Sequence, residues 1–196
     1  TKILDCDFER CTAYEGGVIY INGTNVLLNN LTCQYSLATN GGAFYINGNN
    51  ATISNTDVSY NNATDYGGAI YIAGYFAKMD NVDFEKCIAY TQDGGSIYVS
   101  GYGAVISNST FKENRVNGEK ARGGSMYIQG NGATLEECVF TRCTAYEGGV
   151  IYIKGSNARI ADSSNMYGLA EYGGAIYIAG NNATITHFNA SFSNST

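Results

Sequence analysis

Six cysteines are the residues of this chain that are best suited to covalent or metal chemistry. The pairs Cys6/Cys11 and Cys138/Cys143 share the spacing C-x4-C, and two further cysteines stand alone at positions 33 and 87. A structural zinc site needs several convergent Cys or His ligands, and the chain has a single His. We therefore expect no metal site and no cofactor. Two interpretations of the pairs stay open: a disulfide within each pair, or free thiols that fill small buried positions.

N-x-[S/T] sequons are the second chemical feature, because they accept N-linked glycans in secreted proteins. The chain has eight, whereas random placement of its Asn, Ser and Thr residues gives about three. One interpretation is a secreted glycoprotein whose sequons face solvent; the other is that Asn is favoured at tight corners, with Ser or Thr following as strand residues. We expect covalent N-glycans on the sequons that begin at Asn22, Asn30, Asn50, Asn62, Asn108, Asn182, Asn189 and Asn194.

These residues are carried by a repeat that runs through the whole chain. A Gly-Gly doublet recurs at intervals of 25 to 29 residues and opens phrases such as GGVIYING and GGAIYIAG. Self-similarity with a period in this range is typical of a solenoid. The seven doublets stand at 16–17, 41–42, 67–68, 94–95, 123–124, 148–149 and 173–174.

Each repeat contains three short segments with the pattern of β-strands. Ile70 and Ile72 flank Tyr71 in one phrase, a second segment such as NATI (50–53) follows, and a third centres on a Phe such as Phe84. Three strands in about 25 residues leave no room for a helix, which predicts an all-β, right-handed parallel β-helix. We expect a single array of about seven and a half coils, at 1–25, 26–50, 51–76, 77–103, 104–132, 133–157, 158–182 and, for the half coil, 183–196.

One tyrosine occupies the centre of each phrase. Strand alternation predicts that all seven point outward and stack as a ladder, together with the small residues two positions earlier, such as Ala43 and Val150. Three interpretations stay open: stacking that only stabilises the coils, an apolar face that packs against another protein, or a surface on which carbohydrate stacks. The tyrosines are Tyr20, Tyr45, Tyr71, Tyr98, Tyr127, Tyr152 and Tyr177.

The composition argues against several other classes of protein. Hydrophobic residues make up 44% of the 196 residues and charged residues 14%, which is too apolar for a disordered chain. The net charge of -6 argues against a nucleic-acid partner. No apolar run reaches the roughly 20 residues of a membrane-spanning helix, so we expect no membrane span.

The combination of GGA[ILV] and FxxN once per coil resembles the repeats of chlamydial polymorphic outer-membrane proteins and related surface β-helix proteins. GGAI stands at 67–70 and 173–176, and FxxN at Phe111–Asn114. Other coils carry variants such as GGSI, and FxxC at Phe8–Cys11. The resemblance implies a surface-exposed β-helical protein with adhesive or structural work.

A polysaccharide-cleaving enzyme is the alternative from another class, because many β-helices cleave acidic polysaccharides. NTD at 55–57 is similar to one fragment of a pectin-hydrolase signature. Hydrolysis would also need paired carboxylates and usually a His. The acidic residues are spread at about one per coil, without stacked pairs, and His187 lies about five coils from Asp57. We therefore expect no catalytic residues.

A longer duplication overlies the coils. CTAYEGGVIYI occurs at both 11–21 and 143–153, which indicates a five-coil unit of 132 residues. Neither end of the chain carries a cap, so we expect the rod to be part of a longer array or to stack end to end into a filament. The sequence predicts an extracellular structural or adhesive glycoprotein whose partners are copies of itself or a cell-surface molecule, with a carbohydrate-binding or carbohydrate-cleaving β-helix as the alternative.

Overall fold

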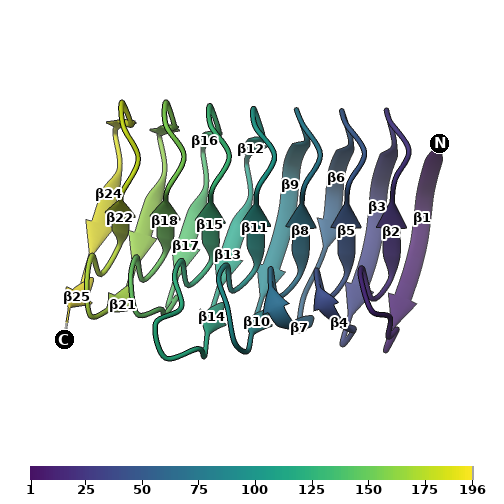
Figure 1. Ribbon diagram of the computed structural model, residues 1–196, viewed down its shortest axis with the longest axis horizontal. Helices are drawn as coiled ribbons and strands as arrows, with labels where there is room; N and C mark the ends of the chain where they lie inside the picture. Colours follow the sequence, from purple (N-terminus) through teal and green to yellow (C-terminus); the bar gives the residue numbers. More distant parts are fainter. Residues whose placement is uncertain (196) are drawn as a thin grey trace.

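The protein is a rod of stacked coils, with its two termini at opposite ends (Figure 1). A computed structural model describes residues 1–195. All strand pairs are parallel, and each strand lies beside its equivalent in the next coil, as Lys2 pairs with Leu27 and Val105 with Thr134. The predicted parallel β-helix is therefore confirmed.

Three sheets run along the rod. The tyrosine sheet contains β2 (Ile19–Ile21), β5 (Phe44–Ile46), β8 (Ile70–Ile72), β11 (Ile97–Val99), β15 (Met126–Ile128), β18 (Ile151–Ile153) and β22 (Ile176–Ile178). The long sheet contains β1 (Lys2–Glu9), β3 (Leu27–Gln34), β6 (Thr52–Asp57), β9 (Lys78–Glu85), β12 (Val105–Ser107), β13 (Thr110–Lys112), β16 (Thr134–Glu136), β17 (Val139–Thr141), β19 (Arg159–Ala161), β20 (Ser164–Met166), β23 (Thr184–Thr186) and β24 (Asn189–Ser191). The short sheet has a four-stranded part and a two-stranded part, which Thr144 links through isolated bridges to Arg115 and Leu169. The four strands are β4 (Leu37–Asn40), β7 (Asn62–Tyr66), β10 (Ile88–Ala89) and β14 (Arg115–Val116), and the two are β21 (Leu169–Ala170) and β25 (Asn194–Ser195).

The strand count per coil differs from the prediction in two ways. The second and third predicted strands belong to one sheet, and in the first, second and fourth coils they form the single eight-residue strands β1, β3 and β9. The short sheet adds a strand that was not predicted. Strands such as β10 and β14 are two residues long, too short for an alternating pattern to be visible in the sequence.

Left-handed residues turn the chain at the corners of each coil. The first glycine of every doublet has a φ between 58° and 75°, which favours glycine strongly. The second glycine is required for a different reason: a Cβ on Gly68 would collide with the backbone of Ile88 and of Gly95 in the next coil. The remaining corners are left-handed positions occupied by Asn in many coils and by larger residues in others, such as Tyr60 (φ 59°) and Arg142 (φ 55°).

The core consists of columns of identical or similar side chains. The aliphatic columns of the phrase are buried in the inner coils, whereas Ile178 in the last phrase is exposed. Beneath the long sheet, Phe84, Phe111 and Phe140 stack with ring centroids 4.8 and 4.7 Å apart. Buried Asn114 accepts a hydrogen bond from the backbone N–H of Cys87 (2.9 Å) and donates one to the carbonyl of Phe84 (3.2 Å). In FxxN, therefore, the Phe fills the core and the Asn joins two coils at the corner.

Candidate functional site

The seven phrase tyrosines form a continuous ladder along the tyrosine sheet. Neighbouring rings are stacked with centroids 4.8 to 5.2 Å apart and interplanar angles of 2° to 11°. Offset-stacked aromatic pairs of this kind contribute roughly 0.5–1.5 kcal/mol each beyond the area they bury. Because each inner ring covers the faces of its two neighbours, the geometry disfavours the interpretation that carbohydrate stacks on this ladder.

The tyrosines stack in the predicted ladder and lie outside the main core cluster, but the middle of the ladder is not exposed to solvent as an outer face would be. Tyr98, Tyr127 and Tyr152 are only 7%, 1% and 6% exposed, whereas Tyr20 is 49% exposed. The reason is that side chains next to the Gly-Gly doublets fold over the rings. The guanidinium of Arg122 lies 4.9 Å from the ring centroid of Tyr127 and 5.2 Å from that of Tyr152.

Asp93 holds Arg122 in this covering position. The buried carboxylate of Asp93 accepts hydrogen bonds from the backbone N–H (2.9 Å), Nε (3.0 Å) and Nη2 (2.7 Å) of Arg122. Desolvation opposes the charge of Arg122, but its hydrogen bond and attraction to Asp93 outweigh that effect and raise its pKa. Desolvation also raises the pKa of Tyr127 to about 12. The centre of the ladder is thus closed to solvent by a charged pair.

The small residues two positions before the tyrosines also differ from the prediction, because they face the core. Ala43, Ala69 and Val150 have no exposed surface and belong to the main hydrophobic cluster. The backbone N–H groups of Ala43 and Phe44 both donate to the carbonyl of Ala69. The strand alternation is therefore broken just after the left-handed glycine, and two consecutive side chains point inward.

All six thiols, which lie within residues 1–195, are free, so the disulfide interpretation of the two pairs is wrong for this structure. Cys138 and Cys143 are fully buried, whereas Cys6 and Cys11 are half-buried. Burial raises the pKa of both Cys138 and Cys143 to about 11. The structure supports the interpretation that these cysteines fill small positions in the columns of the coil.

Most of the predicted glycosylation sites are accessible. Asn62 is half-buried, and among the described residues its Oδ1 has no hydrogen-bond partner. Asn30 and Asn108 share one left-handed corner column, and Asn50 and Asn182 share another. A glycan acceptor must be exposed to solvent. The exposed sequon asparagines are Asn22, Asn30, Asn50, Asn108, Asn182, Asn189 and Asn194.

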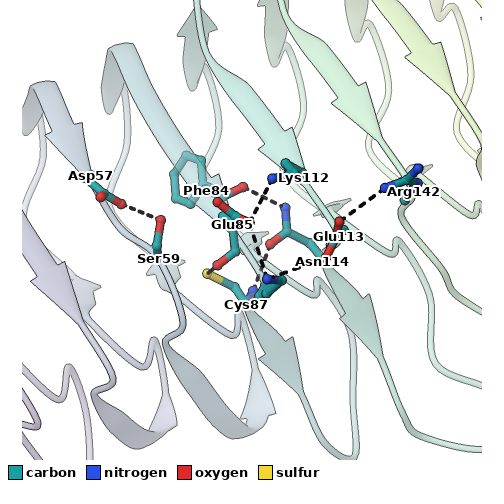
Figure 2. A network of polar contacts seen from close by, with 10 residues as sticks. Asp57, Ser59, Phe84, Glu85, Cys87, Lys112, Glu113, Asn114 and Arg142 are labelled. Carbon is teal, nitrogen blue, oxygen red and sulfur yellow. Dashed lines mark hydrogen bonds and ion pairs between the residues drawn. The ribbon is translucent and has the colours of Figure 1, made fainter.

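Acidic side chains line the outer face of the long sheet, so the prediction that they form no stacked pairs is wrong. Asp57 and Asp83 are direct partners in the adjacent strands β6 and β9. Together with Glu85 and Lys112 they line a hollow of about 290 Å³. Figure 2 shows Lys112 Nζ donating to Glu85, at 2.9 Å. This hydrogen bond lowers the pKa of Glu85. The sequence concealed the Asp57–Asp83 pair because the two residues are 26 positions apart.

Nearby polar side chains donate hydrogen bonds to the carboxylate of Asp57 in this acidic row. Asp57 accepts from Ser59 (Figure 2) and from Gln34 Nε2, at 3.0 Å. His187 lies elsewhere, with its Nδ1 2.9 Å from a carboxylate oxygen of Asp162. The structure therefore brings together a carboxylate pair and leaves the histidine apart from it.

A second ladder, which was not predicted, follows the left-handed corner between the long and short sheets. Glu113 lies 3.8 Å from Lys86 and 3.5 Å from Arg142, the latter contact being drawn in Figure 2. Aromatic pairs flank these charges on both sides, Tyr35 with Tyr60 and Tyr167 with Phe192. We call this column the corner ladder: Arg10, Tyr35, Tyr60, Lys86, Glu113, Arg142, Tyr167 and Phe192. Its signal in the sequence is the second x of FxxN, where charged or aromatic residues recur.

Residues 1–163 match a family model described as "Right handed beta helix region". The match covers more than half of the chain, so the chain belongs to this family, and the right-handed coil is confirmed. No curated protein and no solved structure matches the chain. The family contains both polysaccharide-cleaving enzymes and proteins that are not enzymes. No helix able to cross a membrane is found among residues 1–195.

Proposed function

We propose that this protein is an extracellular structural or adhesive glycoprotein, a rod that acts through its outer surface. The observation that carries this proposal is the exposure of seven of the eight sequon asparagines on the corners and outer strands of the coil.

The distribution of constant and variable residues supports the same proposal. The residues that specify the coil, such as Gly67, Gly68 and Ile70, are buried and recur with little change. The outward column of the long sheet changes from coil to coil, as in Lys78, Val105 and Thr134. A constant scaffold with a varied exterior suits a protein that presents side chains to partners, which we propose to be further copies of the chain or a cell-surface molecule.

The resemblance of the GGA[ILV] and FxxN repeats to those of chlamydial surface proteins supports an adhesive or structural role. Assembly of copies end to end into a filament is part of the same proposal. Sedimentation velocity over a hundredfold range of concentration tests it, because a rod that assembles will sediment faster as concentration rises. A constant sedimentation coefficient would remove self-assembly from the proposal and leave the cell-surface partner.

Intact-mass measurement tests the glycoprotein proposal. The protein from its native source is measured before and after enzymatic removal of N-glycans. We expect the mass to fall by several glycans, with sugar found at Asn30, Asn50, Asn108 and Asn182. An unchanged mass, with unmodified peptides at all four positions, would contradict secretion through a glycosylating route.

A polysaccharide-cleaving enzyme is the second candidate, and the observation that favours it is the pairing of Asp57 with Asp83 in the hollow beside Glu85. A screen for turnover of acidic polysaccharides separates the two candidates. Turnover that is lost in both Asp57→Asn and Asp83→Asn, and kept in the matched surface variant Asp162→Asn, would replace the structural proposal. We expect no turnover by any of these proteins.

A further inference from the structure

A groove runs lengthwise between the corner ladder and the outward residues of the short sheet. It consists of two adjoining hollows of about 380 and 240 Å³, which share Arg142 and Thr144. The first is lined by Lys86, Glu113 and Arg115, and the second continues past Leu169. We call the two hollows together the corner groove. It follows the rod axis, so its walls repeat once per coil.

The corner groove is positively charged in a chain whose net charge is -6. Its lining contains three cations, Lys86, Arg115 and Arg142, and one carboxylate, Glu113. Glu113 is shared between Lys86 and Arg142, at 3.8 and 3.5 Å, and Lys86 also lies 3.5 Å from Glu85, just outside the groove lining. Among the described residues, Arg115 forms no ion pair and its side chain is exposed. The groove therefore has cationic donors available for an anionic partner.

The cations stand on a rigid, evenly spaced frame. The backbone N–H groups of Lys86, Arg115 and Arg142 donate to Lys112, Cys87 and Met166 in neighbouring coils. Coils are spaced by about 4.8 Å, which places the backbones of Lys86 and Arg142 roughly 10 Å apart, with Arg115 on the opposite wall between them. A frame that is already ordered loses little conformational entropy on binding.

We infer that the corner groove binds a linear anionic polysaccharide, through carboxylate or sulfate groups placed along its length. This inference rests on the proposed adhesive role and names the chemistry of the partner. Guanidinium groups hold carboxylate and sulfate-like oxyanions with directed pairs of N–H donors, which Arg115 and Arg142 supply. Beyond Arg142, exposed Tyr167 and Leu169 provide apolar contacts for the C–H groups of sugar rings.

Two features favour a polysaccharide over other polyanions. The strands beside the groove are bonded to neighbouring coils on both sides, so an extended peptide finds no free backbone edge to pair with. Nucleic acid needs more phosphate contacts than three cations provide. A repeating polymer whose charges are pendant groups requires only regularly spaced cations, and the groove supplies these.

Binding of the full chain to a heparin-class sulfated polysaccharide and to polygalacturonate tests the inference, with neutral dextran, poly-Glu peptide and single-stranded DNA as comparisons. We expect binding to at least one acidic polysaccharide that weakens as salt rises. Arg115→Ser and Arg142→Ser should each weaken it about tenfold or more, the effect of losing one charged hydrogen bond. Arg159→Ser, the same change at an exposed arginine on the long sheet, should leave it within twofold.

Several outcomes would overturn the inference. These are no binding to either acidic polysaccharide at low salt, equal binding of dextran, tighter binding of poly-Glu or DNA, or binding unchanged in both groove variants. Arg115 has no ion pair to lose, so thermal melting of Arg115→Ser should match the parent protein and confirm that a loss of binding is local. If the groove fails while the native protein is glycosylated, the inference is wrong and the proposed function stands.

Discussion

Asp93 and Arg122 are 29 residues apart in the sequence, yet they form a bidentate ion pair that lies directly over the tyrosine ladder. Arg122→Met would leave the Asp93 carboxylate buried without its partner, at a cost of about 3–5 kcal/mol in the free energy of unfolding. Arg159→Met is the matched control, because the pair of Arg159 with Glu136 is exposed and contributes less than about 1 kcal/mol. Urea unfolding measures the loss of stability in Arg122→Met and in Arg159→Met. Equal losses would show that the pair over the ladder has no special role.

The second glycine of the doublet makes a steric prediction. Gly68→Ala should lower the free energy of unfolding by about 3 kcal/mol or more, because the new Cβ has no space between adjacent backbones. Gly132 is the matched control: it is left-handed (φ 66°), but a Cβ there meets nothing within 4 Å. Gly132→Ala should therefore cost only the conformational strain of about 1–2 kcal/mol. Melting curves that rank the two variants the other way would refute the packing argument.

The raised pKa values of the half-buried Tyr45 and the buried Tyr127 predict a loss of stability at alkaline pH. Burial raises the pKa of Tyr45 and of Tyr127 to about 12, whereas an unfolded tyrosine titrates near pH 10. Below about pH 10 the hydroxyls are protonated in both states, and the stability is fully present. Between about pH 10 and 12 the unfolded state loses protons first, so the stability should fall. Urea midpoints at pH 9 and 11 measure this, and Tyr127→Phe should reduce the decline. A midpoint independent of pH would contradict the burial of the ladder.

The cysteines should fall into two classes that differ in their reactivity toward alkylating reagents. Burial raises the pKa of Cys87 to about 12 and that of Cys143 to about 11, which removes nearly all thiolate at pH 8. The half-buried Cys6 and Cys11 should react with an alkylating reagent in the native protein, and all six cysteines should react after denaturation without a reductant. Mass spectrometry counts the labels. Fewer than six labels in the denatured protein would restore the disulfide interpretation.

The fold could be predicted from the sequence because the same pattern of alternating apolar residues after a Gly-Gly doublet recurs in every coil. Ile70 and Ile72 alternate with Tyr71, and the equivalent residues stand 25 to 29 positions away in each neighbouring coil, so their columns and the parallel register follow from the sequence. The aromatic column of Phe84 and Phe111 was visible for the same reason. Residues at equivalent positions of neighbouring coils lie in one column, so a column that is apolar in the sequence can be assigned to the core.

Burial at the candidate surfaces could not be predicted, because it depends on side chains from other coils. Tyr20 and Tyr152 lie in identical eleven-residue segments, yet they are 49% and 6% exposed. Tyr152 stacks between Tyr127 and Tyr177 and is also covered by Arg122, 30 positions away, whereas Tyr20 stacks on Tyr45 at the end of the ladder. The corner ladder was missed for a related reason: Tyr60 and Arg142 have a positive φ, which is uncommon for such residues and which local preference does not predict.

The stacking direction of the coils determines how the rod responds to mechanical force. Hydrogen bonds between coils run along the rod axis, so tension between the two termini pulls on one rung at a time and peels the end coil away from the next. Each coil occupies about 4.8 Å of the rod but contains about 25 residues, which extend to roughly 85 Å once released. Stretching therefore converts the rod into a long tether in successive steps of similar length, while the coils that remain stay packed on one another.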